Sequence, residues 1–141
     1  MTTQPVVYAD GTTLSPQEVM MVARGQATVE VSENAWPLIH AARDVVERIV
    51  ETGETVYGIN TGFGALVKER ISQEDLANLQ INLVSSHATG LGENMSVEAV
   101  RAMMMVRLNS LCKGHSGINP DCIRQLVLYL NHGIHPVVPR I

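Results

Sequence analysis

The sequence is poor in aromatic side chains, which make up 4% of its 141 residues. Hydrophobic residues nevertheless account for 45% of the chain, whereas a disordered chain needs low hydrophobicity and high net charge. We therefore expect one folded domain of ordinary size, with aliphatic side chains and methionine in place of rings. The few aromatic residues are Tyr8, Trp36, Tyr57, Phe63 and Tyr129.

The sequence also lacks a basic excess and a long apolar run. Its formal net charge is −4 and its pI is about 5.7, whereas a protein that follows nucleic-acid phosphates carries a basic face. No run reaches the roughly 18 apolar residues of a membrane span. The first residues lack the basic and apolar regions of a secretory signal. We expect a cytoplasmic protein with neither nucleic acid nor membrane as partner.

Cysteine is scarce, and no metal-ligand spacing is present. Cys112 and Cys122 are too few for a disulfide framework, and their apolar neighbours favour buried free thiols. His132 and His135 lie three residues apart without a cysteine or carboxylate at zinc-site spacing. We therefore expect no metal ion.

Hydrophobic residues recur at spacings of three and four in five stretches, which is the pattern of amphipathic helices. The clearest helix start is the capping box formed by Ser15 and Glu18 around Pro16. Short alternating segments near Val7 and Val29 indicate two minor strands. The sequence thus predicts an all-α, mainly helical fold. The helical arginines are expected to lie mostly on exposed faces, and they are Arg24, Arg43, Arg48, Arg101 and Arg107. The expected helix starts are Ser15, Ser32, Ser72, Ser96 and Asn119.

Residues 54 to 71 contain a glycine-rich stretch that suits neither a helix nor a strand. Its hydrophobic side chains favour an ordered loop. The stretch lacks the Gly-Lys-Ser/Thr ending of a P-loop and the GxGxxG order, so nucleotide binding is not indicated. Tyr57 lies at its start. It is either a core tyrosine or an acid/base group, and the second role needs a site that stabilises phenolate, because a tyrosine pKa is near ~10.

His87 continues the apolar stripe of Leu79 and Leu83 on the helix that begins near residue 72. A histidine in such a stripe is commonly a core residue whose ring nitrogens are satisfied. The alternative is an imidazole that orients a polar substrate, because Ala88-Thr89-Gly90 places it near the end of the helix.

Four segments, taken in order, resemble the N-terminal part of the histidine and aromatic amino-acid ammonia-lyases and the related aminomutases. The first is Tyr57-Gly58-Ile59-Asn60-Thr61-Gly62-Phe63-Gly64, and the second is Ser86-His87-Ala88-Thr89-Gly90. The third runs from Arg107 to Gly117, and the fourth from Gly133 to Pro139. The resemblance extends over nearly the whole chain.

The resemblance implies a mostly helical homotetramer with composite active sites and an amino acid as substrate. Family members carry the electrophile 4-methylidene-imidazol-5-one (MIO), formed from an internal Ala-Ser-Gly. It activates the amino acid so that ammonia leaves and a β-proton is removed. Tyr57 occupies the place of the family's catalytic acid/base, and His87 that of a substrate contact. Gly62 and Gly64 match loop glycines that let a lid pass close to the substrate.

The substrate implied is L-histidine, with trans-urocanate as product. A tyrosine ammonia-lyase or a tyrosine 2,3-aminomutase is the enzymatic alternative. Ala-Ser-Gly occurs nowhere in the 141 residues. We therefore expect residues 1–141 to be a single N-terminal lyase domain fragment, inactive alone, with the MIO-forming segment and central helical bundle outside it. The alternative of another class is a non-catalytic helical interaction module.

Overall fold

The computed structural model describes residues 4–61 and 73–141, and within residues 73–77 it describes the backbone alone. The chain divides into two compact units, one made of Met1–Arg43 with Leu91–Ile141 and the other of Asp44–Gly90. Helices dominate the described residues and the strands are short, which confirms the expected mainly helical fold. The elements are β1 (Val6–Ala9), α1 (Pro16–Ala23), β2 (Thr28–Val31), α2 (Ala35–Thr52), α3 (Gln73–His87), α4 (Val97–Leu111) and α5 (Pro120–Asn131).

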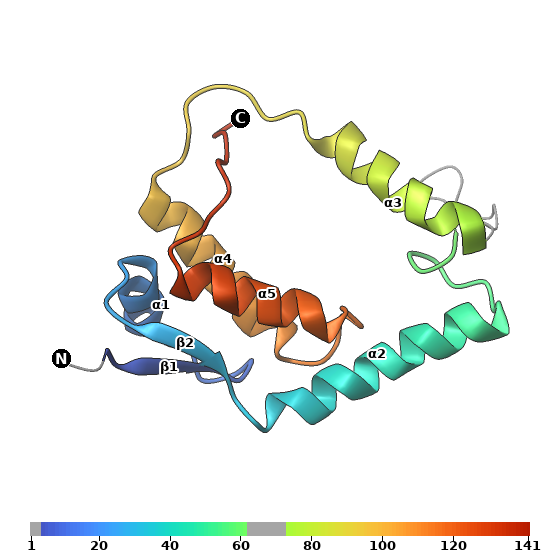
Figure 1. Cartoon of the computed structure of the whole chain (residues 1–141), viewed down its shortest axis with the longest axis horizontal. Coiled ribbons are helices and arrows are strands. Elements are labelled where there is room, and N and C mark those ends of the chain that lie inside the picture. The colour runs from blue at the N-terminus through green and yellow to red at the C-terminus, as the bar shows by residue number, and fades with distance from the viewer. Residues whose placement is uncertain (1–3, 62–72) are drawn as a thin grey trace. The chain divides into compact units, whose positions relative to one another are not determined.

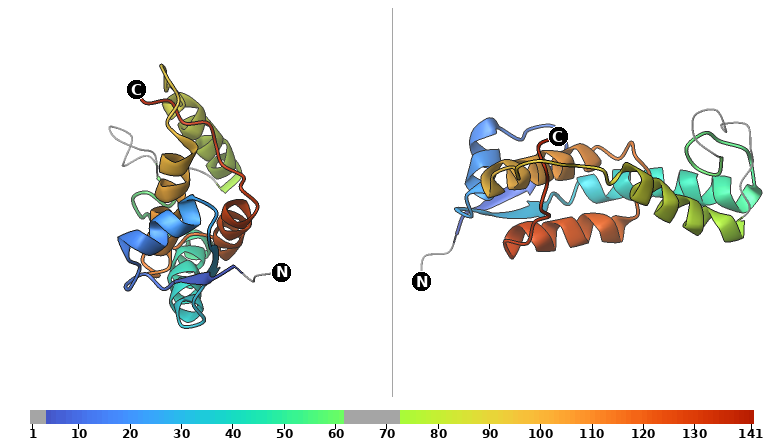
Figure 2. Two further views of the ribbon diagram at one scale, coloured as in Figure 1. Left: turned by 90° about the vertical axis from the view of Figure 1, so that its left-hand side faces the viewer. Right: turned by 90° about the horizontal axis from the view of Figure 1, so that it is seen from above.

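In the first unit, β1 and β2 form a parallel pair in which Val6 lies opposite Thr28. Parallel strands cannot be joined by a tight hairpin, and here α1 lies in the connection between them. Helix α1 packs against α4, and α5 packs against both α4 and β2 (Figures 1 and 2). The first nine residues of α2 belong to the same unit.

The core of this unit is aliphatic, as the scarcity of aromatic residues predicts. Each helix and strand of this unit contributes at least one buried side chain to the core. The buried cluster contains no aromatic ring among the described residues. Trp36 packs against the cluster from its edge. The largest buried side chains include Ile39, Met105, Leu108, Ile123 and Leu130.

The cysteines differ from each other in burial. Cys112 is fully buried, and this burial, with a smaller effect from Asp10, raises the pKa of its thiol to about 11. Cys122 is exposed, so its predicted burial is wrong. It lies on the first turn of α5, and the face that the helix buries is the one that carries Ile123 and Leu130. Both thiols are free.

Local sequence signals locate most helix starts. Ser15 and Glu18 form the expected capping box, and Ser96 and Asn119 accept hydrogen bonds from the amides of Ala99 and Asp121. Helix α2 instead begins at Ala35, three residues after the expected cap Ser32. Pro37 then lies in the first turn of α2. Proline has no amide hydrogen, and in the first turn this costs no helical hydrogen bond.

The second unit holds the end of α2, a connecting segment and α3. The side chains of its described helical residues are mostly exposed or half-buried. None of the helices in the described part of the chain is long and apolar enough to cross a membrane.

The turn between α4 and α5 passes very close to the start of α2 in the first unit. Gly114 has a φ of +69°, and a Cβ atom there would lie 2.6 Å from the backbone of Leu38. Gly25 has the same φ of +69°, but a Cβ atom there would meet nothing within 4 Å. Substituting each glycine in turn therefore distinguishes two costs. A side chain at Gly25 meets only the cost of the left-handed backbone, and one at Gly114 also meets the Leu38 backbone.

We expect Gly114→Ala to destabilise the protein more than Gly25→Ala. Both substitutions place alanine in the left-handed region, at a cost of roughly 1–2 kcal/mol. Gly114→Ala adds an overlap with backbone atoms, which costs about 1–3 kcal/mol more. Urea unfolding of the two variants measures the difference, and equal losses of unfolding free energy would contradict the close approach.

Candidate functional site

A closed turn follows α2 and carries Tyr57. The side chain of Asn60 is 4% exposed and makes two hydrogen bonds to the backbone before Tyr57. Its Oδ1 accepts from the amide of Val56 at 2.9 Å, and its Nδ2 donates to the carbonyl of Glu54 at 2.6 Å. The amides of Ile59 and Asn60 both donate to the Val56 carbonyl. Asn60 therefore fixes the two ends of the turn to each other.

Tyr57 lies at the tip of this turn, next to Gly58. Its side chain is 62% exposed, so the interpretation of Tyr57 as a core tyrosine is wrong for the described chain. Gly58 has a φ of +81°, a conformation that favours glycine, and a Cβ atom there would meet nothing within 4 Å. The backbone fold thus presents the phenol outward from a position that Asn60 holds.

His87 is the last residue of α3 and is exposed. The expected core position in the leucine stripe is therefore wrong, since Leu79 and Leu83 are themselves only half-buried. The ring Nδ1 lies 2.8 Å from the carbonyl oxygen of Leu83 and 3.1 Å from the hydroxyl of Ser86. Because a carbonyl oxygen only accepts, the bond to Leu83 requires the proton on Nδ1, and in the neutral imidazole Nε2 is then the acceptor.

Tyr57 and His87 belong to the same unit, Asp44–Gly90, but lie on different elements. The hydrogen bonds of the His87 ring to Leu83 and Ser86 stay within its own helix, so they fix the ring independently of the turn. Gly62 and Gly64 lie outside the described residues, and their roles as lid glycines stay predictions. No group of three or more metal-ligating side chains occurs among the residues that the structure describes.

Sequence reasoning missed Asn60 as a structural centre of the loop. The signal was present, since an asparagine beside turn residues commonly bonds to nearby backbone groups. Thr61, the next residue, is also buried, at 2% exposure. Two buried polar residues in succession indicate that the start of this loop is fixed by hydrogen bonds.

Comparison with known proteins gives a consistent result. The family described as "Aromatic amino acid lyase" matches residues 14–141. A histidine ammonia-lyase of Staphylococcus aureus (strain bovine RF122 / ET3-1) is 44% identical over 134 residues, which are 95% of this chain and 27% of that protein. The chain thus spans about a quarter of the length of the curated relatives it matches.

Solved structures agree with the sequence comparison. A tyrosine aminomutase from Streptomyces globisporus has a TM-score of 0.89 at 37% identity and covers 97% of this chain and 26% of its own. A histidine ammonia-lyase from Trypanosoma cruzi has a TM-score of 0.87 at 40% identity, over 95% of this chain and 26% of that one.

We expect Asn60→Ala to loosen the turn while leaving the helices folded. The change removes two hydrogen bonds of about 1 kcal/mol each, so hydrogen exchange over residues 54–61 should accelerate by roughly 5–30-fold. Asn82→Ala is the control, because Asn82 is an exposed asparagine in the same unit. Exchange mass spectrometry measures both variants. Equal protection of residues 54–61 in the two variants would show that Asn60 does not hold the turn.

Proposed function

The chain belongs to the aromatic amino acid lyase family, and we propose that the protein is an ammonia-lyase that converts L-histidine to trans-urocanate. The choice of histidine is supported by the relatives from Staphylococcus aureus and Trypanosoma cruzi, which are both named histidine ammonia-lyase. A cytoplasmic homotetramer with composite active sites is the assembly that we propose for the complete protein.

The observation that carries the proposal is the exposed phenol of Tyr57 on a turn closed by Asn60. Elimination of ammonia requires a base that removes a β-proton of low acidity while the carbon–nitrogen bond breaks. A base must be held within hydrogen-bond reach of that proton. In our proposal Tyr57 is this catalytic acid/base, and Asn60 is a positioning residue that acts through it.

A phenol becomes an effective base at neutral pH only where the surroundings stabilise phenolate and exclude water. Tyr57 is 62% exposed, so in our proposal its phenol has to be covered when the substrate is bound. In our proposal, other parts of the complete protein, or another subunit, contribute to this cover. We propose that Gly62 and Gly64 belong to a lid that closes over the substrate near Tyr57.

His87 is proposed to contact the side chain of the substrate. Its Nδ1 proton bonds to the Leu83 carbonyl, which leaves Nε2 as an acceptor for a substrate donor. The imidazole N–H of histidine and the phenol O–H of tyrosine are both such donors. The geometry of His87 therefore supports a polar aromatic substrate and does not by itself select between these two.

The prosthetic group that we propose is MIO, formed from an Ala-Ser-Gly outside residues 1–141. When present, it supplies the electrophile that makes the amino group a better leaving group. The side chains proposed here are consistent with this group. A phenol can transfer a proton and an imidazole can contact the substrate, but neither activates an amine as a leaving group. Tyr57 would move the β-proton, and His87 would orient the aromatic ring.

The second candidate is a tyrosine ammonia-lyase or a tyrosine 2,3-aminomutase. The likeness to the Streptomyces globisporus tyrosine aminomutase, with its TM-score of 0.89, supports it. An aminomutase returns the released ammonia to the β-carbon, whereas a lyase lets it escape. The two activities thus share the proton removal assigned to Tyr57.

We expect the complete protein to form urocanate from L-histidine, and Tyr57→Phe to lower kcat by about 10²–10⁴-fold, the usual contribution of a general acid/base. Tyr8→Phe is the matched control, because Tyr8 is also exposed, at 56%, but lies in the other unit. The assay follows urocanate formation, and thermal unfolding verifies that both variants fold.

Near-normal turnover by the Tyr57→Phe variant would remove Tyr57 from the mechanism. Turnover of L-tyrosine without turnover of L-histidine would favour the second candidate. A complete protein that converts neither amino acid would support the non-catalytic helical module instead.

A further inference from the structure

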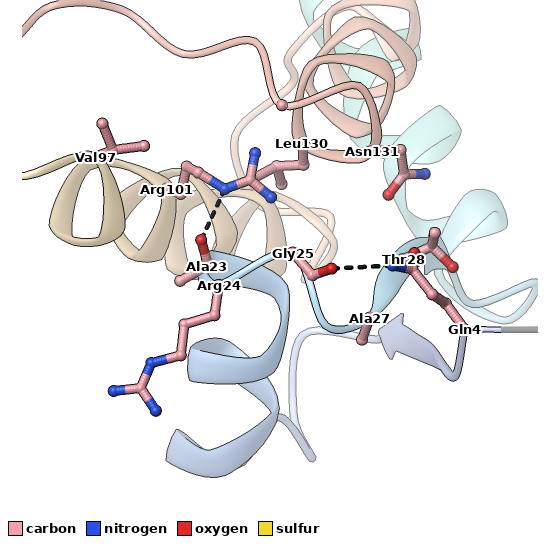
Figure 3. A pocket seen from close by; sticks show the side chains of 11 residues that line it. Gln4, Ala23, Arg24, Gly25, Ala27, Thr28, Val97, Arg101, Leu130 and Asn131 are labelled. Carbon is pink, nitrogen blue, oxygen red and sulfur yellow. Dashed lines mark hydrogen bonds between the residues drawn. The ribbon is translucent and has the colours of Figure 1, made fainter. Parts of the chain in front are cut away.

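A pocket of about 390 Å³ lies in the first unit, and neither Tyr57 nor His87 lines it. It is lined by the end of α1 and the following turn, the first turns of α4 and the end of α5 (Figure 3). Small-molecule sites in proteins commonly begin at about 300 Å³, so the pocket is large enough for a small ligand.

Arg101 lines this pocket and is an almost completely buried cation. Its side chain lies in α4, and the residue is only 6% exposed, which corrects the expectation of a solvent-facing arginine. Nε donates to the carbonyl of Ala23 at 2.8 Å, and Nη2 donates to the carbonyl of Val22 at 2.7 Å. Nη1 is buried and has no hydrogen-bond partner among the described residues.

The two carbonyls leave the charge of Arg101 uncompensated. They belong to the C-terminal end of α1, whose partial negative charge favours a cation but is smaller than one full charge. No aspartate or glutamate lines the pocket in the described part of the chain. Glu98 is close in sequence, but its carboxylate pairs with Arg24, whose Nε lies 2.9 Å from Oε2. A buried charge with an unused donor is costly unless an acceptor completes it.

Two side-chain amides provide further donors at the pocket. Gln4 uses Nε2 to donate to the carbonyl of Gly25, and Asn131 uses Nδ2 to donate to the carbonyl of Val29. Each amide nitrogen carries two hydrogens, so one more donor remains on each. In Figure 3 the guanidinium of Arg101 lies between Val97 on the left and the amides of Asn131 and Gln4 on the right. The pocket thus combines one cation with neutral donors.

We propose that this pocket binds the carboxylate of a small molecule, with Nη1 of Arg101 as its charged donor. Nε and one hydrogen of Nη2 are committed to carbonyls, so two hydrogens on Nη1 and one on Nη2 remain, and the guanidinium carries one positive charge. That set matches the single charge of a carboxylate better than the higher charge of a phosphate. The amides of Gln4 and Asn131 would receive the polar remainder of the ligand.

Val97 provides a test that leaves Arg101 in place as the partner of α1. It is the first residue of α4, lines the pocket and is 52% exposed. It stands four residues before Arg101, the spacing at which a glutamate and an arginine face each other on a helix. Val97→Glu therefore supplies a carboxylate from the chain itself, and Val97→Gln is a neutral control of nearly the same size.

In the experiment, sodium acetate is titrated into the complete protein at constant ionic strength, and calorimetry measures the binding. Acetamide serves as the uncharged probe. We expect saturable binding of acetate but not of acetamide. Val97→Glu should weaken acetate binding by at least about tenfold, because the new glutamate carboxylate would take the hydrogen bond from Arg101 that acetate needs. Val97→Gln should keep the binding.

Three results would overturn the proposal. If acetate and acetamide bind equally, or if Val97→Glu and Val97→Gln bind acetate with equal affinity, the anion is not held by Arg101. If the wild-type protein shows no saturable acetate binding, Nη1 is satisfied by a group of the protein itself and the pocket is not a ligand site.

Discussion

The hydrogen bonds between the Arg101 guanidinium and the carbonyls of Val22 and Ala23 are the constraint on which the first unit depends. The last carbonyls of a helix have no partner within it, and Arg101 reaches them from another helix, α4. Helix α1 lies in the connection between two parallel strands, so fixing its end also fixes the point from which the chain enters β2. One buried cation thereby links α4, α1 and the sheet.

In the second unit, a buried polar side chain also holds the backbone by hydrogen bonds. Asn60 replaces water as the partner of two backbone groups and closes the turn on which Tyr57 is exposed. The turn supplies position, and an elimination also needs dry surroundings for the phenol. In the proposed lyase activity, this chain positions the acid/base residue and contributes to the lid, and the electrophile comes from outside residues 1–141.

The parts of the fold that follow from neighbouring residues could be predicted from the sequence. Ser15, Ser96 and Asn119 cap helices because their partners lie within three residues. Arg101 could not be placed, because its partners are 78 and 79 residues away and only the packing of α4 on α1 brings them close. The family motif identified Tyr57 and His87, but their exposure depends on packing. The spacing of the leucines before His87 predicted a buried position, which is wrong.

The central claim is that Tyr57 removes the β-proton of the substrate. The most direct measurement compares turnover of L-histidine with that of β-deuterated L-histidine by the Tyr57→Phe variant of the complete protein. Loss of the base slows the breaking of the carbon–hydrogen bond, so we predict a clear isotope effect on kcat/KM, no smaller than that of the wild type. An effect near one in the slowed variant would place the defect in another step and contradict the account.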